Sequence, residues 1–511
     1  MNSSRRARAL PALALIALLV VWVTTAWLCD DAFITFRTVQ NLWHGDGLTW
    51  NPGERVQAYT HPAWMLFCAF GYGLSSECYF SILGLSFVLT FATALSLIYP
   101  LCASPLMAAS LVFALSASSS FVQYSACGLE NPLLFLLLVL FSAALRKPHA
   151  GSELLRPALL ASAIALTRID ALLLIGPSCL VLLHERKTAR RRALAELAIG
   201  SAPFWLWELF SLVYYGSFVP NTAIAKLNVA VPAEQLYGHG AAYFVDSLRR
   251  DPITLVVSAA LALHLARRRQ RRDQAVVVGL LLYVVYLLRI GGDFMSGRFC
   301  GSLLVLALAA SADSLARIER TRPLLGALLA YAALWPHSPW HVQLDDGRGL
   351  GFADVVQPNG IADEHAFYYP STGLVRVLLY RQQIVDHGWP LPPFGTAIRG
   401  RAYARSNEPL ETTCMVGMFG YFAERKFVVD RCALADPFLA RIEFRDAVGF
   451  RPGHFIREPS DDYLDSIVTG HNQLRDPDLA KLYERVQLLV RGPLFTSARW
   501  RAIWCLNTNS C

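Results

Sequence analysis

Charged residues are scarce in this chain. Only 16% of its 511 residues are Asp, Glu, Lys or Arg, whereas 54% are hydrophobic, and the mean hydropathy is +0.38. A disordered chain needs many charges and few apolar residues, so this composition excludes disorder and is too apolar for an ordinary soluble enzyme. Apolar stretches recur through the first two thirds and stop near Pro336. The sequence therefore predicts an integral membrane protein with one soluble tail domain.

The basic residues lack the even spread that a nucleic-acid-binding surface needs. The formal net charge is +8, but Lys and Arg gather in short clusters between apolar stretches. This pattern is typical of the positive-inside rule, by which cytoplasmic loops collect basic residues. It excludes nucleic acid as the partner and indicates a membrane. The clusters are residues 5–8, 146–147, 184–192, 267–272 and 317–322.

Metal-binding patterns are missing too. The sequence has no His/Cys cluster at zinc spacing and no all-oxygen loop of the calcium-binding type. It also has no inverted internal repeat of the kind that many transporters use. We therefore expect no bound cofactor, although a divalent cation at the acidic pair Asp30 and Asp31 stays open.

The N-terminal apolar run, Leu10 to Leu28, is long enough to cross a membrane. It has no small-x-small cleavage site, and the bulky Leu28 before Cys29 argues against lipoprotein processing. We interpret the run as an uncleaved signal anchor with a cytoplasmic N-terminus. Asp30 and Asp31 then emerge on the outer face.

The remaining apolar stretches alternate across the membrane in a consistent way. About 11 membrane segments are expected, within a transmembrane domain of residues 1–338. Residues 61–74 predict a helix in the outer interface, and 156–183 predict two half-helices that meet at Arg168 and Asp170. Polar outer loops are expected at 29–60, 127–132 and 216–251. The expected spans are 10–28, 80–100, 105–121, 133–145, 194–215, 253–266, 275–290, 299–315 and 323–337.

The tail, residues 339–511, is expected to form an extracytoplasmic α/β domain. Residues 412–422 and 426–430 resemble strands, and residues 477–491 predict a helix. Four cysteines lie in the tail: Cys414, Cys432, Cys505 and Cys511. An even number in an oxidising compartment permits two disulfides, of which Cys505 with Cys511 is the local pair; free buried thiols are the alternative.

Ionisable and polar side chains collect on the outer face in this topology. Ionisable groups so close to hydrocarbon normally line a cavity or pair with one another. A cavity that holds both carboxylates and basic groups suits a lipid-linked substrate with a phosphate. The candidates for donor binding are Arg37, Tyr59, His61, Glu130, Arg168, Asn221, Lys226, Asp293 and Arg298.

A polyprenyl-phosphate sugar would suit the outer face, where ATP and nucleotide sugars are not available. Its phosphate leaves as a stable anion, so the reaction needs no general acid. One carboxylate must take the proton of the acceptor hydroxyl, and positive charge must stabilise the departing phosphate. A carboxylate beside a second one in a partly desolvated cleft has a raised pKa that suits a base. Asp30 and Asp31 are therefore the catalytic candidates.

The first outer loop also carries a family resemblance. "DDAFITFRTVQNLWHGDGLTWNPGERVQAYTHPAW" (30–64) resembles the first-loop signature of the GT-C membrane arabinofuranosyltransferases, a family that acts on mycobacterial cell-wall arabinan and on pseudomonad pilin. The chain is similar to this family in further motifs, in the same order. They are "CGLENPL" (127–133), "LTRIDALLL" (166–174), "YGSFVPNTAIAKL" (215–227), "GGDFMSGRF" (291–299) and "FVVDRCALADPFLARI" (427–442).

The resemblance implies an inverting glycosyltransferase in a bacterial inner membrane, with its tail in the periplasm. The donor would be a polyprenyl-phospho-arabinofuranose, and the acceptor a glycan or a protein such as pilin. The aspartate at the start of the first loop would be the base, here Asp30 or Asp31, with Asp30 preferred. Two positions depart from the family pattern: Ile169 replaces Pro and Asn131 replaces Thr.

Plainer interpretations remain for several residues. Arg37 could pair with an aspartate, Glu130 could only begin a helix, and Asn221 could only cap one. Arg168 with Asp170, and Asp293 with Arg298, could be internal ion pairs. His61 is better explained as a hydrogen-bonded interface residue than as a metal ligand.

Three other functions remain to be weighed against arabinose transfer. Transfer of mannose or another polyprenyl-linked sugar would use the same mechanism. A lipid or sugar transporter predicts charge deep in several spans and paired repeats, and a non-catalytic scaffold leaves the polar outer face without a purpose.

Overall fold

The computed structural model describes residues 2–99, 104–146, 154–185, 190–317, 321–341, 355–379, 385–386, 389–390, 394–445, 451–508 and 510. The chain divides into two compact units. The first, here called the helical unit, contains residues 1–29, 82–204 and 233–382. The second, the loop–tail unit, contains residues 30–81, 205–232 and 383–511.

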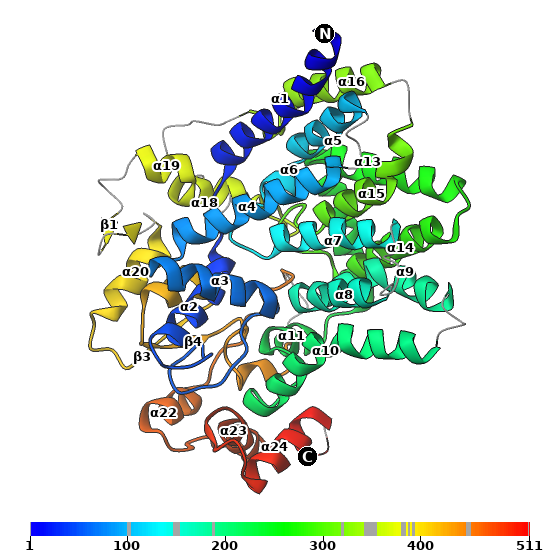
Figure 1. The fold of residues 1–511 in the computed structure, drawn as a ribbon. Coiled ribbons are helices and arrows are strands. Elements are labelled where there is room, and N and C mark those ends of the chain that lie inside the picture. Colours follow the sequence, from blue (N-terminus) through cyan, green and yellow to red (C-terminus); the bar gives the residue numbers. More distant parts are fainter. Residues whose placement is uncertain are drawn as a thin grey trace. The chain divides into compact units, whose positions relative to one another are not determined.

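The helical unit is built from apolar helices that pack side by side. In Figure 1, α7 and α15 are neighbours, and so are α9 and α14. Its elements are α1 (Asn2–Thr25), α5 (Pro105–Ala117), α6 (Ser119–Val122), α7 (Asn131–Arg146), α8 (Leu155–Thr167), η2 (Ile169–Ala171), α9 (Leu172–Glu185), α12 (Ala233–Arg250), α13 (Pro252–Arg267), α14 (Arg271–Ile290), α15 (Cys300–Leu315), α16 (Thr321–Leu334), α18 (Glu364–Thr372) and α19 (Leu374–Leu379). Two helices, α4 (Tyr79–Ile98) and α10 (Arg190–Tyr214), run across the division between the units.

Small residues let these helices approach closely. A Cβ added to Gly279 of α14 would lie 2.0 Å from the backbone oxygen of Leu174 on α9. Close backbone approach of this kind is the usual packing of apolar helices that cannot rely on the hydrophobic effect between them.

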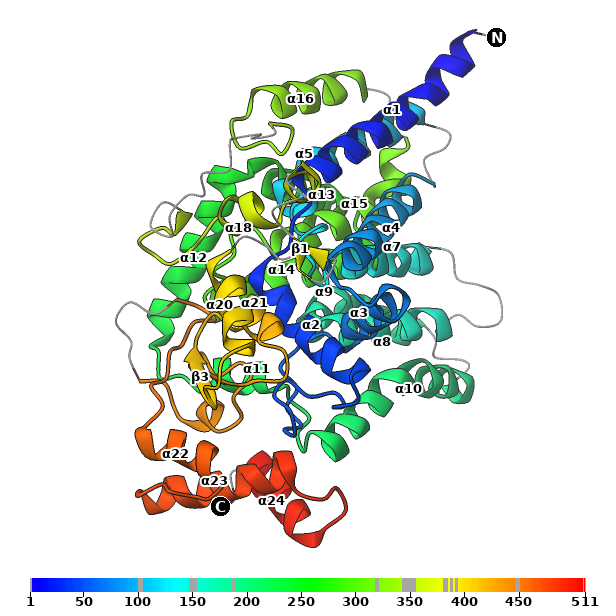
Figure 2. The ribbon, with the colours of Figure 1, turned by 90° about the vertical axis from the view of Figure 1, so that its left-hand side faces the viewer.

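The loop–tail unit gathers segments that are far apart in the sequence. Helix α2 (Asp30–Trp43) packs against α3 (Pro62–Ser75) and against α21 (Val416–Phe422), which also contacts α20 (Gly395–Ala404). Figure 2 shows α2 beside α20 and α21. The remaining elements are α11 (Asn221–Leu227), β1 (Val385–Asp386), β2 (Trp389–Pro390), β3 (Leu410–Thr413), β4 (Phe427–Asp430), η5 (Leu439–Arg441), α22 (Asp461–Thr469), α23 (Pro477–Arg491) and α24 (Ser497–Thr508).

The strands make two small sheets. β3 and β4 are parallel, with Leu410 opposite Phe427, and α21 connects them. β1 and β2 form a two-residue antiparallel pair. A tail that combines helices with short strands agrees with the α/β composition that we predicted for it.

Three described helices are long and apolar enough to cross a membrane: α4, α14 and residues Arg191–Tyr214 of α10. Residues Ala9–Thr25 with α2 would add a fourth if that bent pair were one span. Most of α2 is buried within the loop–tail unit, so we treat it as lying beyond the span. Six shorter apolar helices follow the other predicted spans, and the number of about 11 segments stays a prediction.

Two predictions about local structure are wrong. The loops expected at 29–60 and 216–251 contain the helices α2, α11 and α12. Residues 412–422, expected as a strand, are a strand only to Thr413 and then form α21. The first two segments are polar in sequence, and the third alternates apolar and polar residues. In each segment, tertiary contacts decide the secondary structure against this local pattern. The break at Arg168, the strand at 427–430 and the helix at 477–491 are confirmed.

The compact units do not coincide with the predicted division into 1–338 and 339–511. Residues 30–60, expected as an outer loop, cluster with the C-terminal residues, and α18 and α19 cluster with the helical unit. For example, the Leu374 amide donates to the Ala26 carbonyl at 2.8 Å. The membrane boundary near residue 338 stays a prediction.

The three tail cysteines within the described residues are oxidised. A disulfide joins Cys414 to Cys432, a pair that we did not single out, and it ties β3 to the segment after β4. Cys505 is disulfide-bonded as well, but its predicted partner Cys511 lies outside the described residues. Six described cysteines between residues 29 and 300 form no disulfide. Among the described residues the disulfide-bonded cysteines all lie in the tail, which agrees with an extracytoplasmic location for it.

Candidate functional site

The acidic pair begins α2 in the loop–tail unit. Asp30 is 8% exposed, and its carboxylate accepts the amides of Gly417 at 3.0 Å and Met418 at 2.8 Å. These are amides of the first turn of α21, which lack a partner within their own helix. Burial raises the pKa of Asp30 to about 6, and the charge of Asp31 contributes to the rise. Asp31 is partly exposed, so it is the carboxylate that a substrate can reach more easily.

Close packing fixes this arrangement. A Cβ on Gly417 would lie 1.8 Å from the Asp30 carbonyl oxygen, so only glycine lets α21 approach α2 here. Asp30 therefore joins two helices that are almost 390 residues apart in sequence. Asp30 therefore helps to hold α2 and α21 together.

Arg37 is a structural residue in this geometry. It is fully buried, and its guanidinium donates to the carbonyls of Trp50 at 2.7 Å, Gly420 at 2.6 Å and Lys426 at 2.6 Å. The Arg37 guanidinium also lies over the Trp50 ring, 4.2 Å from its centroid. Because carbonyl oxygens occupy its donors, the geometry argues against both predicted roles, phosphate binding and pairing with an aspartate.

Tyr59 and His61 are buried in the same unit. The Tyr59 hydroxyl lies 2.9 Å from that of Tyr215, and Nε2 of His61 lies 2.8 Å from the Thr35 hydroxyl. These contacts agree with the interpretation of His61 as a hydrogen-bonded residue.

Asn221 is the first residue of α11, and its side chain does not cap the helix. It is 6% exposed, and its side-chain amide donates to the carbonyls of Ala433, Leu434 and Asp436 at 3.0–3.1 Å. It anchors the turn after β4 to α11. Lys226, later on α11, is exposed.

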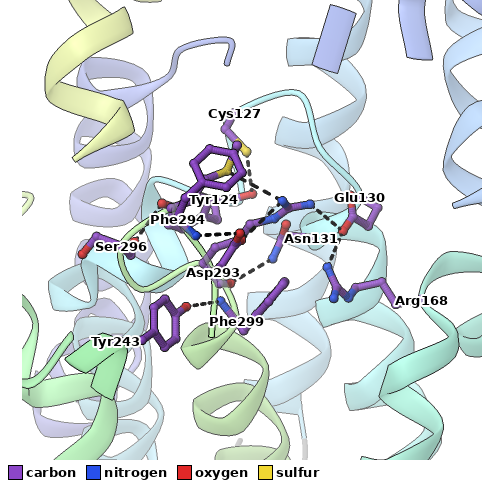
Figure 3. Close-up of polar contacts among 12 residues, drawn as sticks. Tyr124, Cys127, Glu130, Asn131, Arg168, Tyr243, Asp293, Phe294, Ser296 and Phe299 are labelled. Atoms are coloured by element: carbon purple, nitrogen blue, oxygen red, sulfur yellow. Dashed lines mark hydrogen bonds and ion pairs between the residues drawn. The ribbon is translucent and has the colours of Figure 1, made fainter. Parts of the chain in front are cut away.

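The helical unit contains a buried ion network centred on Glu130, shown in Figure 3. Glu130 is 1% exposed and accepts Arg168 at 2.8 Å and Arg298 at 3.2 Å. Arg168 also donates two hydrogen bonds to Asp170, at 2.6 and 3.1 Å. Arg298 lies 3.5 Å from Asp293. The sequence identified all five residues but not that they form one network.

Neutral groups complete the network. The guanidinium carbons of Arg168 and Arg298 lie 4.3 and 5.5 Å from the ring centroid of Phe299. Asn131 donates to the Arg298 carbonyl at 3.3 Å, and the Tyr283 hydroxyl donates to Asp170 at 3.3 Å. Phe299 ends the "GGDFMSGRF" motif, but Tyr283 lies in an apolar helix and gave no signal in the sequence.

Carboxylates already compensate both cations of this network. Three carboxylates face two guanidiniums, which gives a formal charge of −1. A phosphate would therefore meet no uncompensated cation here. The network is better explained as a fixed polar surface between the helices than as a site that binds an anion. Within the described ranges, no group of three or more His, Cys, Asp and Glu side chains could hold a metal ion. Whether a cofactor is needed stays a matter of prediction.

Fold and sites together define a mostly helical protein with several apolar helices, an oxidised tail and ionisable groups buried among helices. These features, with the relatives below, indicate a membrane protein. No family model matches the chain, and no solved structure matches it.

Two curated relatives are similar to it. One is named a terminal β-(1→2)-arabinofuranosyltransferase of Mycobacterium tuberculosis; it is 30% identical over 404 residues, which cover 68% of this chain and 63% of the relative. The other carries the same name in Corynebacterium glutamicum and is 28% identical over 324 residues, covering 54% and 46%. The chain thus spans less than two thirds of the length of either relative. The resemblance to arabinofuranosyltransferases that its motifs predict is confirmed.

Proposed function

We propose that this protein is a membrane glycosyltransferase that moves arabinofuranose from a polyprenyl-phosphate donor to a cell-envelope glycan or protein. The observation that carries the proposal is the identity of 30% over 404 residues with a relative named as an arabinofuranosyltransferase. The composition and the apolar helices support a reaction at the membrane. The disulfide in the tail supports a location of the tail at the outer face of that membrane. We place the protein in a bacterial inner membrane, with the N-terminus cytoplasmic.

Asp31 is the base in this proposal. It takes the proton of the acceptor hydroxyl, whose oxygen attacks the anomeric carbon as the bond to the phosphate breaks. The polyprenyl phosphate leaves as an anion and needs no proton. Asp30 acts as a positioning residue, because both of its carboxylate oxygens accept amides of α21. This choice differs from our preference from the sequence, which was Asp30.

The mechanism has a stereochemical consequence. A single displacement attacks the face opposite the leaving group and inverts the anomeric carbon. If this chain forms the β linkage in its relatives' name, the displaced donor phosphate must be α-configured. A β product from a β donor would instead require two displacements, and one base would not suffice.

The test uses membranes that contain the wild-type chain or its Asp31→Asn variant. Each receives [14C]arabinofuranose on polyprenyl phosphate, as both anomers, or the mannose analogue. We expect label from the arabinose donor in envelope glycan or protein, and a loss of transfer in the variant. Absence of transfer from the arabinose donor by an inserted, folded protein would overturn the function, and transfer from mannose alone would replace the sugar. Unchanged transfer by the variant would overturn the base assignment.

A further inference from the structure

A lipid-linked donor needs a cation for its phosphate that the protein has not already neutralised. The arginines that the sequence suggested do not meet this condition. Carbonyl oxygens hold Arg37, and three carboxylates hold Arg168 and Arg298. The phosphate therefore needs other cationic side chains.

Two arginines line one pocket of the loop–tail unit. The pocket is a small depression that is partly open to solvent, and Arg55 and Arg441 contribute to its wall together with Gln57, Tyr215, Val219 and Asn221. No acidic residue is among the described residues that line it. Its polar wall therefore carries positive charge only.

Both guanidiniums have hydrogen-bond capacity to spare. Arg55 donates from Nη2 to the Gly492 carbonyl, while its buried Nε has no hydrogen-bond partner among the described residues. Arg441 donates from Nη1 to the Pro437 carbonyl at 2.7 Å, the one side-chain hydrogen bond described for it. Burial lowers the pKa of Arg55, and lowers that of Arg441 to about 10, with no carboxylate opposing the shift.

A third guanidinium adds to the positive potential. Arg499 is fully buried and donates to the carbonyls of Leu489, Val213, Tyr214 and Leu494. Burial and the nearby charge of Arg55 lower its pKa to about 10. Arg55 and Arg441 are partly buried and Arg499 beside them is fully buried. Like charges removed from water are stabilised by an anion, so the pocket suits an oxyanion.

The pocket lies at the end of an apolar helix. Tyr215 follows α10, and the Arg55 guanidinium lies 6.0 Å from the ring centroid of Tyr214. Tyr214 stacks on Phe210 at 5.1 Å, and Phe210 contacts Trp207 at 5.2 Å, so an aromatic row continues down the helix. On the same helix, Trp205, Leu206 and Leu209 are 57–65% exposed, as expected of a lipid-facing surface.

Three segments that carry the family resemblance also meet here. Arg55 belongs to the first-loop motif, Val219 to "YGSFVPNTAIAKL", and Arg441 to "FVVDRCALADPFLARI". We propose that this pocket binds the phosphate of a polyprenyl-phosphate lipid between Arg55 and Arg441, with the isoprenoid chain along the aromatic row of α10. The inference rests on the proposed function, because it names the site for the lipid phosphate of that reaction.

The test measures binding without turnover. The purified full-length protein in nanodiscs is titrated with undecaprenyl phosphate, with undecaprenol and with inorganic phosphate, and binding is read by native mass spectrometry. We expect binding of the lipid phosphate and little of the other two. Arg441→Gln should weaken it about tenfold or more, which corresponds to about 1.4 kcal/mol, whereas Arg441→Lys should keep part of it. If inorganic phosphate and the lipid phosphate occupied the pocket equally, the claim that the pocket binds the phosphate of a lipid would be overturned.

Two variants of Val219, at the rim of the pocket, distinguish a loss of the site from misfolding. Val219 is 42% exposed, so Val219→Asp should fold and place a competing carboxylate in the pocket, while Val219→Asn has the same size without the charge. We expect the first to lose binding and the second to retain it. Arg445→Gln, at an exposed surface pair, is the control for general charge. Equal binding by Val219→Asp and Val219→Asn, or by Arg441→Gln and wild type, would overturn the site.

The transfer assay separates this inference from the function. Arabinose transfer that Arg55→Gln and Arg441→Gln leave unchanged would overturn the pocket and keep the function. Lipid-phosphate binding that depends on both arginines, without arabinose transfer by the wild type, would keep the pocket and overturn the function.

Discussion

At the scale of single residues, the neighbours Asp30 and Asp31 have different surroundings. Asp30 is buried and bonded to two amides, whereas Asp31 is partly exposed. The sequence shows two adjacent carboxylates after an apolar run, but not which of them another segment covers. That difference depends on Gly417 and Met418, which lie almost 390 residues away.

The two aspartates should therefore respond differently to the same substitution. Asp31→Asn should lower kcat by roughly 10²–10⁴-fold, because it removes the proton acceptor. Asp30→Asn should lower the free energy of unfolding by about 1–3 kcal/mol, because an amide nitrogen cannot accept the second backbone N–H. Transfer kinetics and thermal unfolding of both variants check this; a catalytic loss confined to Asp30→Asn would return the base to Asp30.

Glu130 offers a second test at this scale. Its carboxylate contacts both Arg168 and Arg298, and it is 1% exposed. Glu130→Ala should destabilise the protein by about 3–5 kcal/mol, because it leaves buried guanidiniums short of a partner. Glu130→Gln keeps an acceptor oxygen and should cost less. Thermal unfolding in the same detergent compares them, and equal Tm values for Glu130→Ala and wild type would contradict the network's role.

At the scale of elements, the sequence predicts the apolar helices well and the polar segments poorly. The expected span 275–290 lies within α14, and the break in 156–183 falls at Arg168, because helix length and apolar runs are local properties. Helix α21 was expected as a strand, since its packing on α2 through Gly417 is not local. For the same reason the sequence proposed Asn221 as a cap, although it holds the 433–436 turn.

That turn contains a buried acid that makes stability depend on pH. Asp436 is 4% exposed; it accepts the amides of Phe438 and Leu439 through Oδ1 and the Tyr463 hydroxyl through Oδ2. Burial raises its pKa to about 7. Between its unfolded value of about 4 and 7 the folded state binds more protons than the unfolded state. The free energy of unfolding should therefore fall as pH rises through this window.

Asp436→Asn isolates this effect, because an amide can keep all three hydrogen bonds without a charge. Relative to wild type, the variant should gain stability between pH 5 and pH 8, by about 1–4 kcal/mol. Chemical unfolding across this pH range measures the difference. A constant difference at all pH values would contradict a raised pKa at Asp436.

At the scale of the whole molecule, membrane topology and disulfides make one joint prediction. A disulfide between Cys414 and Cys432 requires that the tail reach an oxidising compartment. In intact cells, a membrane-impermeant maleimide should label these cysteines only after reduction, and a Cys414→Ser/Cys432→Ser variant should lose the share of the labelling that these two residues contribute, while Cys505 still reacts. Labelling that needs permeabilised cells but no reductant would put the tail inside. Loss of the bridge should also cost about 2–4 kcal/mol of unfolding free energy.

The whole-molecule organisation is what the sequence could reveal least. Its motifs gave the resemblance and most residues of the ion network, because these lie in short, recognisable segments. The division into two compact units could not be read from the order of apolar and polar stretches. The loop–tail unit joins the first loop, the end of α10 and the C-terminal residues, so the Arg55–Arg441 pocket gave no local signal.

The most direct test of the central claim is transfer by the purified protein in proteoliposomes. These contain synthetic α- or β-configured polyprenyl-phospho-[14C]arabinofuranose and an arabinan oligosaccharide acceptor, and the linkage of the product is determined by NMR. The account predicts labelled oligosaccharide with inverted anomeric configuration from wild type and none from Asp31→Asn. Failure of the folded wild-type protein to transfer arabinose from either anomer, under conditions in which it binds polyprenyl phosphate, would contradict it.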